Sequence, residues 1–328
     1  MKTKISRRGF VKSSLLATAA IPLGLNAQTA STSGPAAAPA ATAGQTETQP
    51  MGRIGNQEFS RLMLGGNLIG GYAHSRDLSY VSNLMRSYNT EAKIRETLEL
   101  AETHGITAIN TWVMQENSTL FAHWKAGGRM KWIAQVRLDG NGGYAQIMQA
   151  IDQGATAIHV TGDTAEGLLV QGKFDKVGET VGLIKSQKRI AGVAAHDLRV
   201  IVECEKLKLD VDFYQKTLHT HDYYTAPRPD ETAAVGAHDN SWCNDPQAVV
   251  DFMATVSKPW IAFKILAAGA IPPRAAFPYA FNSGADFILV GMFDWQVAEN
   301  AKLARRVVIQ VTKPGSQRTR PWYGRVVS

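Results

Sequence analysis

Short apolar runs alternate with amphipathic stretches along most of this chain. The apolar runs predict eight buried strands: Phe59–Leu64, Ala108–Trp112, Trp132–Leu138, Ala157–Thr161, Ile190–Ala195, Phe213–Thr217, Ile261–Leu266 and Phe287–Val290. The stretches between them predict helices, among them Glu91–His104, Gly143–Gln153, Lys176–Ser186, Leu198–Leu207 and Pro246–Val256. Strands that alternate with helices in this way build a parallel sheet whose faces the helices cover.

Several of these helices are followed by a glycine turn directly before the next strand, as at Gly105, Gly154 and Gly284. Repeated βα units predict an α/β fold of the (β/α)₈ TIM-barrel class, in a single domain over residues 53–312. A doubly wound open sheet is the alternative. However, no G-x-G-x-x-G follows the first strand, and a loop at a barrel mouth explains the glycine-rich residues 65–71 equally well.

The first residues differ in character from the rest. Ser6-Arg7-Arg8-Gly9-Phe10-Val11-Lys12 matches the S-R-R-x-F-x-K pattern of twin-arginine signal peptides. The apolar stretch after it, Leu15 to Leu25, is too short for a stable membrane span, which needs about 20 apolar residues. Residues 1–27 are therefore predicted to be a signal peptide that engages the twin-arginine translocation machinery, and we expect a periplasmic or extracellular protein.

Composition divides the remaining chain. Residues 28–52 are rich in Ala, Thr and Pro and poor in large apolar residues, which predicts a disordered linker. At the other end, residues 313–328 carry Lys313, Arg318, Arg320 and Arg325, and are predicted to form a basic, solvated C-terminal tail. The only cysteines, Cys204 and Cys243, lack metal-ligand spacing, and the sequence leaves their disulfide status open.

The net charge of +7 comes largely from the predicted signal peptide, which holds five Lys and Arg residues and no acidic residue. Without it, 30 basic residues face 28 acidic ones, a net charge of +2. So small a charge gives no support for nucleic-acid binding. We expect a small-molecule partner instead.

Polar residues gather where the predicted strands end, which is where TIM barrels carry their chemistry. The candidates for catalysis are Asn110 toward the end of the second strand, His159 in the fourth, His196 after the fifth and Lys264 in the seventh. His159 is either a general acid or hydrogen-bond donor to a substrate carbonyl, or a satisfied core residue. Lys264 is either an imine-forming amine or proton donor whose pKa burial lowers, or a lysine paired with a carboxylate.

The loop after the sixth strand offers a different chemistry. His219, His221 and Asp222 lie close in sequence, and imidazole and carboxylate groups can hold a divalent metal such as zinc or manganese. An ordinary polar loop is the alternative. Several aromatic residues also follow strands and predict either sugar-stacking platforms or loop packing: Trp112, Trp124, Tyr223, Tyr224, Trp242 and Trp295.

Several segments together resemble the aldo-keto reductases. They are Arg53-Ile54-Gly55 with residues 60–66, Ile106 to Thr111, Ala157-Ile158-His159, Gly192 to His196, and residues 285–292 followed by Glu299-Asn300. The resemblance implies a TIM barrel that reduces or oxidises a carbonyl, with His159 polarising the substrate. It also implies a nicotinamide cofactor, NAD(P), contacted by Gly291, Glu299 and Asn300.

The chain departs from that family where catalysis is concerned. Asn110 stands where the family has a catalytic aspartate, Gln135 and Arg137 stand near its catalytic lysine, and Gln296 replaces the basic residue expected at a 2′-phosphate. Tyr72, Tyr80 and Tyr88 are the only tyrosines near the position of the catalytic one.

Three hypotheses follow. The first is an exported oxidoreductase similar to aldo-keto reductases, acting on a carbonyl or sugar with His159. The second is a metal-dependent or cofactor-free lyase, isomerase or hydrolase of a carbohydrate that uses His196, His219, His221, Asp222 and Lys264. The third is a binding protein built on a degenerate barrel.

Overall fold

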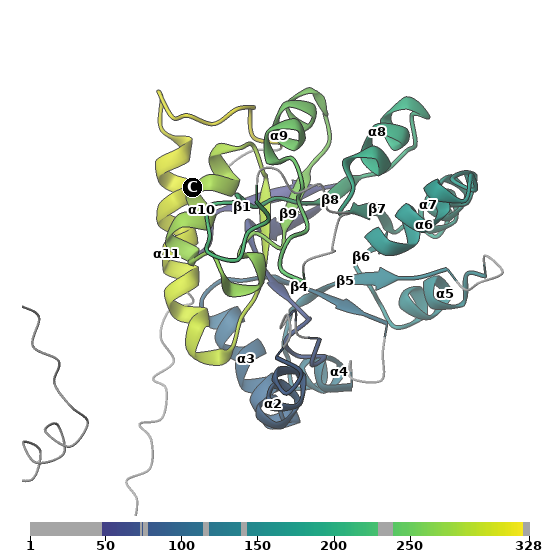
Figure 1. The fold of residues 1–328 in the computed structure, drawn as a ribbon. Coiled ribbons are helices and arrows are strands. Elements are labelled where there is room, and N and C mark those ends of the chain that lie inside the picture. The colour runs from purple at the N-terminus through teal and green to yellow at the C-terminus, as the bar shows by residue number, and fades with distance from the viewer. Residues whose placement is uncertain are drawn as a thin grey trace, which may run out of the picture. The chain divides into compact units, whose positions relative to one another are not determined.

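Eight parallel strands close into a barrel in the computed structural model, which describes residues 48–72, 74, 78–113, 118–138, 143–228 and 239–323. The strand order around the barrel is β10-β3-β4-β5-β6-β7-β8-β9, and the helices lie outside it (Figure 1). The predicted (β/α)₈ barrel is confirmed, and the open-sheet alternative is wrong. The predicted signal peptide and residues 28–47 of the predicted linker lie outside the described residues.

The barrel strands are β3 (Leu62–Gly65), β4 (Ala108–Trp112), β5 (Lys131–Val136), β6 (Ala157–Val160), β7 (Ile190–Ala195), β8 (Phe213–Thr217), β9 (Trp260–Phe263) and β10 (Phe287–Gly291). The described helices are α2 (Val81–Tyr88), α3 (Glu91–Thr103), α4 (Ser118–Lys125), α5 (Ala145–Asp152), α6 (Gly162–Val170), α7 (Asp175–Ser186), α8 (Leu198–Lys206), α9 (Pro246–Thr255), α10 (Pro273–Asn282) and α11 (Asp294–Thr312), with the short 3₁₀ turn η2 (Ala267–Gly269). No described helix has the length and apolar character needed to cross a membrane.

The predicted first strand is two elements. Strands β1 (Met51–Ile54) and β2 (Gln57–Ser60) form an antiparallel hairpin, and the barrel strand β3 starts only after Arg61. Ile54 and Phe59 of the hairpin are fully buried and pack into the core inside the barrel. Residue 49, which falls in the predicted disordered linker, is part of the fold. The buried Gln49 side chain donates to the carbonyls of His104 and Ala301 at 3.0 and 3.1 Å.

The barrel interior is layered because every second residue of a strand faces inward. One layer is apolar and belongs to the interior core: Met63, Ala108, Ile133, Ala157, Phe213, Ile261 and Phe287. Two residues further along the strands, the next layer toward the carboxyl ends includes four polar side chains: Asn110, Gln135, His159 and Gln215. The interior therefore changes from apolar to polar toward its carboxyl end.

Gly192 of β7 makes room for an aromatic ring inside the barrel. A Cβ at this position would lie 2.3 Å from Cζ of the fully buried Phe213. We expect Gly192→Ala to lower the free energy of unfolding by about 1–3 kcal/mol, because the packed ring cannot move aside without strain. Denaturant unfolding measures this, and Phe213→Leu in the same chain should restore part of the loss. An unchanged transition midpoint for Gly192→Ala would contradict this packing.

Two of the basic residues that the sequence places in a solvated C-terminal tail are buried, while residues 313–317 are exposed and Arg325 lies outside the described residues. The Arg318 and Arg320 side chains are only 4% and 5% exposed, and both pair with the fully buried Asp286, which precedes β10. Arg318 Nη2 lies 3.0 Å from Asp286 Oδ1, and Arg320 Nη2 bonds Oδ2. A buried carboxylate must be paired, and its arginines follow it by more than thirty residues. We call Asp286, Arg318 and Arg320 the C-terminal clasp.

Both cysteines are free, buried thiols. Cys204 lies on α8 and Cys243 in the segment between β8 and α9. Burial raises the pKa of the Cys204 thiol to about 12, and burial also raises that of Cys243. Neither is therefore a thiolate at neutral pH.

Candidate active site

A cavity of about 710 Å³ occupies the carboxyl end of the barrel, and residues of all eight barrel strands line it. Asn110, His159, His196 and Lys264, which the sequence predicts to be catalytic, all lie in its wall. Of the predicted aromatic platforms, Trp112 and Trp242 line it as well. The structure thus brings together side chains that are up to 154 residues apart in the sequence.

The sequence predicts Lys264 inside the seventh strand, but the residue lies one position beyond the end of β9. Its backbone has a φ of 56°, in the left-handed region that non-glycine residues seldom adopt. The Nζ atom lies 3.6 Å from the centroid of the Trp242 ring and 2.6 Å from Nε2 of His74. Burial lowers the pKa of Lys264 to about 7, so its charged and neutral forms coexist at neutral pH.

His74 connects Lys264 to a carboxylate. Its Nδ1 lies 3.0 Å from Oδ1 of Asp239, so we assign the ring proton to Nδ1, which leaves Nε2 to accept from Lys264 Nζ. Burial, and next the nearby Lys264, lower the pKa of His74 and favour this neutral ring. The chain Asp239–His74–Lys264 is a continuous hydrogen-bonded path for a proton that leaves the amine.

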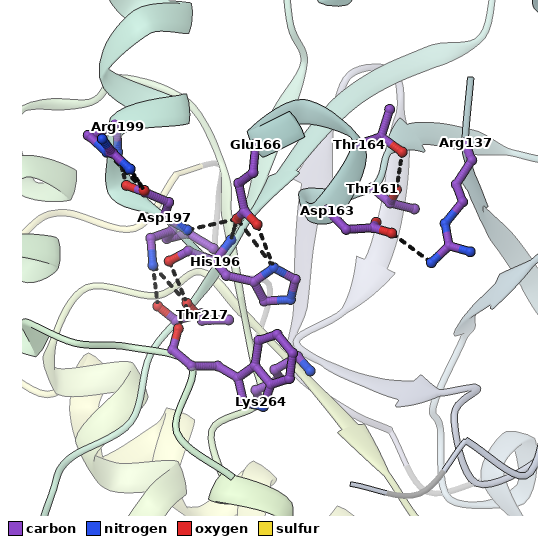
Figure 2. Close-up of polar contacts among 12 residues, drawn as sticks. Arg137, Thr161, Asp163, Thr164, Glu166, His196, Asp197, Arg199, Thr217 and Lys264 are labelled. Carbon is purple, nitrogen blue, oxygen red and sulfur yellow. Dashed lines mark hydrogen bonds and ion pairs between the residues drawn. The ribbon is translucent and has the colours of Figure 1, made fainter. Parts of the chain in front are cut away.

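His196 forms a second acid–base group with Glu166 of α6. Nδ1 of His196 lies 3.3 Å from Glu166 Oε2, while Glu166 Oε1 accepts from the backbone N–H groups of His196 and Asp197 at 2.5 and 2.8 Å (Figure 2). Burial lowers the pKa of His196 although Glu166 opposes the shift, so the ring is neutral at pH 7. With its Nδ1 engaged by the carboxylate, Nε2 remains for a substrate, as in other carboxylate–histidine pairs.

Local sequence explains how His196 comes so close to α6. The helix begins at Gly162, where a Cβ would stand 2.8 Å from His196 Nδ1, so any larger residue would displace the ring. The ring is also held between aromatic side chains, with centroid distances of 4.7 Å to Trp242 and 5.4 Å to Phe263. Its position is therefore fixed on three sides.

Trp242 is the wall that the two acid–base groups share. Its backbone N–H donates to Nε2 of His219 at 2.9 Å, and its indole N–H donates to the Asp239 carbonyl at 2.9 Å. Nδ1 of His219 in turn donates to the Thr220 carbonyl at 3.0 Å. Burial lowers the pKa of His219 to about 4, so this buried ring is neutral and acts by positioning Trp242.

The structure gives no support to the predicted metal site at His219, His221 and Asp222. Both nitrogens of His219 are used as just described, His221 Nε2 bonds the Cys243 carbonyl at 2.7 Å, and Asp222 is exposed. Across the described ranges, no three His, Cys, Asp or Glu side chains are grouped so that they could hold a metal ion. The histidines instead tie the segment after β8 to residues 242 and 243.

His159 and Asn110 form a hydrogen bond inside the barrel, and their roles differ from the predicted ones. Nδ1 of His159 bonds the Val160 carbonyl at 3.1 Å, so Nδ1 carries the proton and Nε2 accepts from Asn110 Nδ2 at 2.9 Å. Burial lowers the pKa of the fully buried His159 to about 4. In this arrangement Nε2 has no proton to donate to a substrate carbonyl, so His159 fixes the Asn110 amide.

Of the three residues predicted to contact a nucleotide, one lines the cavity and two do not. Gly291 borders the cavity, as does Gln296 of α11. Glu299 lies on the exposed side of α11, where its carboxylate is 3.2 Å from Arg274, and Asn300 is buried. Neither Glu299 nor Asn300 belongs to the cavity wall, and their contact with a nucleotide stays a prediction.

The rim of the cavity is charged. Arg137, just after β5, lies 4.5 Å over the Trp112 ring, and its Nη2 is 2.6 Å from Asp163 Oδ2 (Figure 2). Burial alone would raise the pKa of Asp163, but hydrogen bonding to Thr161 and pairing with Arg137 lower it. The ion pair therefore persists at neutral pH at the entrance.

Sequence reasoning missed His74, Glu166 and Asp239. His74 and Asp239 are 165 residues apart and lie in irregular segments, where no periodic pattern marks them. Glu166 carried a weak signal, because it lies in the first turns of the helix that follows β6 and so near the carboxyl end of the strands.

No protein-family model matches this chain, and no curated protein matches its sequence. Solved structures do match. A structure named "Putative aldo-keto reductase from Pseudomona aeruginosa" aligns with a TM-score of 0.55 and 17% identity, over 80% of this chain and 97% of that one. A second structure of that description and organism aligns with a TM-score of 0.53 and 17% identity, over 79% and 94%. These similarities establish a shared barrel fold.

Proposed function

We propose that this protein is an enzyme that transfers protons at and beside the carbonyl group of a small sugar-like compound, as a cofactor-independent isomerase or lyase. The observation that carries the proposal is the pairing of Lys264 and His196 against one aromatic wall. Each contacts the Trp242 ring and lines the same cavity, and each is backed by its own carboxylate through hydrogen bonds.

The two groups suit opposite halves of one reaction. Neutral His196 accepts a proton at Nε2 from the carbon next to the carbonyl, while protonated Lys264 gives a proton to the carbonyl oxygen, forming an enediol. His196 then gives its proton to the former carbonyl carbon while Lys264 recovers one from the neighbouring hydroxyl, which completes an isomerisation with no net change in atoms or electrons. A lysine with a pKa of about 7 both donates and recovers a proton near neutral pH, and its charge stabilises the developing enolate.

Oxidation or reduction of the same carbonyl is the second candidate, an activity that the solved structures named as aldo-keto reductases suggest. Gly291 at the cavity supports it. Against it, Glu299 and Asn300 do not line the cavity, and Asn110 and Gln135 stand where the reductases carry catalytic residues. Cofactor-independent chemistry is therefore proposed first.

Proton exchange separates the candidates. The purified protein is incubated with a panel of aldoses and ketoses in deuterium oxide, and NMR follows the C–H signal next to each carbonyl. We expect deuterium incorporation without added nucleotide, and no stoichiometric NAD(P) released by acid. Bound nucleotide together with a change in the reduced-nicotinamide absorbance on adding substrate would replace the proposal with the second candidate. Exchange with no panel member would refute the proposal.

Glu166→Gln tests the role of the carboxylate behind His196. We expect a decrease in kcat of about 10–100-fold, the usual effect of losing a group that orients a functional histidine. Because the carboxylate raises the pKa of His196, the acidic limb of the pH–rate profile should move to lower pH. Glu179→Gln on the surface of α7 is the control and should leave both unchanged. An unmoved acidic limb in Glu166→Gln would exclude His196 as the base.

A further inference from the structure

Two buried oxygens of residues that line the cavity have no hydrogen-bond partner within the part of the chain that the structure describes: Oδ1 of Asn110 and Oε1 of Gln215. Their residues are only 1% and 2% exposed. An unsatisfied buried acceptor loses its hydration without compensation, and native structures contain few of them. Two such atoms in one cavity therefore point to a ligand that donates to them.

The Asn110 oxygen is an acceptor by necessity rather than by choice of amide orientation. His159 has its proton on Nδ1, which bonds the Val160 carbonyl, so its Nε2 can only accept. The Asn110 amide must therefore present Nδ2 to the ring, and its oxygen faces away from His159. His159 acts here as a positioning residue that fixes which atom of Asn110 remains for a ligand.

Gln215 is placed by the alternation of β8. Phe213, two residues earlier, belongs to the apolar interior layer, so Gln215 also points inward. Its register partner on β7 is the small Ala194, which also lines the cavity. Strands β4 and β8 are four places apart in the closed order of eight, so Asn110 and Gln215 lie on opposite sides of the barrel.

Charge is arranged by depth in this cavity. The inner layer offers amide oxygens beside the His159 ring, which is neutral because burial lowers its pKa to about 4. The basic side chains Lys264 and Arg137 follow the ends of their strands, nearer the mouth. A carboxylate or phosphate has only acceptors to offer and would be repelled by Asn110 Oδ1, whose amide nitrogen already donates to His159, whereas a hydroxyl group would donate to that oxygen.

We propose that Asn110 Oδ1 and Gln215 Oε1 are specificity determinants that accept hydrogen bonds from substrate hydroxyl groups at the floor of the cavity. The ligand class is a neutral polyhydroxylated compound with donors on opposite sides, such as an aldose, ketose or polyol. This deepens the proposed function, on which only the identification of the ligand as substrate rests. The recognition itself needs no turnover.

Gln215→Met tests the assignment, since methionine has nearly the same shape and no acceptor amide. Without ligand, the thermal midpoint of the variant should equal or exceed that of the natural chain, because an unpaired acceptor has been removed. Calorimetric affinity for aldoses, ketoses and polyols of three to seven carbons should fall by at least about 10-fold, as expected for a lost hydroxyl contact in a buried site. Asn110→Leu should weaken the same ligands. Gln247→Met on the exposed side of α9 should change neither quantity.

The outcomes are distinct. A lower midpoint with unchanged affinity for Gln215→Met would show that Oε1 serves the fold, and unchanged values for both would show that water alone satisfies it; either result overturns the proposal. So would a natural chain that binds no neutral member of the panel. If the affinity depends on Gln215 but no C–H exchange occurs in deuterium oxide, the hydroxyl-binding role of Gln215 stands and the proposed reaction is refuted.

Discussion

Lys264→Met should lower kcat/KM by about 10²–10⁴-fold, the range expected when a positioned proton donor is lost. Methionine keeps much of the lysine's length against Trp242 but removes the amine that His74 accepts from. Lys264→Arg should not restore activity, because a guanidinium does not release its proton in this pH range. The basic limb of the pH–rate profile, set near pH 7 by this lysine in the natural chain, should disappear in both variants.

The same substitution has a signature in stability. Burial lowers the pKa of Lys264 from 10.5 to about 7. Between these values the unfolded chain holds a proton that the folded chain has released, so the natural protein gains stability as pH rises through this window. Lys264→Met lacks this group, so we expect its stability relative to the natural chain to be greatest at or below pH 7 and to decline toward pH 10.

Denaturant unfolding at a series of pH values measures this difference. Lys176→Met is the matched control, since Lys176 pairs with Glu179 on the exposed surface of α7. Its difference from the natural chain should stay nearly constant over the same window. A constant difference for Lys264→Met as well would mean that Lys264 is not neutralised by folding, and full turnover in this variant would remove it from the chemistry.

Asp286→Ala should lower the free energy of unfolding by about 3–5 kcal/mol, the typical effect of removing one partner of a buried ion pair. The carboxylate pairs with Arg318 and Arg320 and also accepts from the backbone N–H groups of Trp260 and Tyr323 at 3.0 and 2.8 Å. Its loss leaves two guanidinium groups without their counter-ion.

Glu299→Ala is the control for the loss of stability expected in Asp286→Ala. Its ion pair with Arg274 has side chains 73% and 80% exposed, and exposed pairs typically contribute only about 0–1 kcal/mol. Chemical unfolding of both variants should therefore separate them clearly. If Asp286→Ala does not fold, Asp286→Asn, which retains acceptor capacity, should fold with reduced stability. Equal small losses for Asp286→Ala and Glu299→Ala would mean that the clasp contributes little.

The barrel was predictable because its strands begin in short, largely apolar runs that alternate with amphipathic stretches and turns. Ala108–Trp112, Ile190–Ala195 and Phe213–Thr217 have the predicted bounds, since apolar runs between helices and turns leave little freedom in placing them. The location of the cavity followed from the fold class, because βα loops all meet at one end of a barrel.

The roles of individual side chains were less accessible. His159 was found from its place in an apolar strand, yet its protonation state depends on Asn110, 49 residues away. The connection of Lys264 to Asp239 passes through His74, which is 190 residues from the lysine. The cluster of basic residues near the C-terminus was misleading as well. It suggested an exposed tail, whereas the fold buries Arg318 in an ion pair with Asp286.

The C-terminal clasp also bears on the order in which this protein matures. Arg61 Nη1 donates to the Asp286 carbonyl at 2.8 Å, and the Arg318 and Arg320 side chains pair with the carboxylate of the same residue. One residue therefore joins the start of the barrel to the segment after its last helix. A nascent chain cannot complete this junction until residue 320 has left the ribosome. The barrel with all these contacts can therefore form only after synthesis has passed that residue.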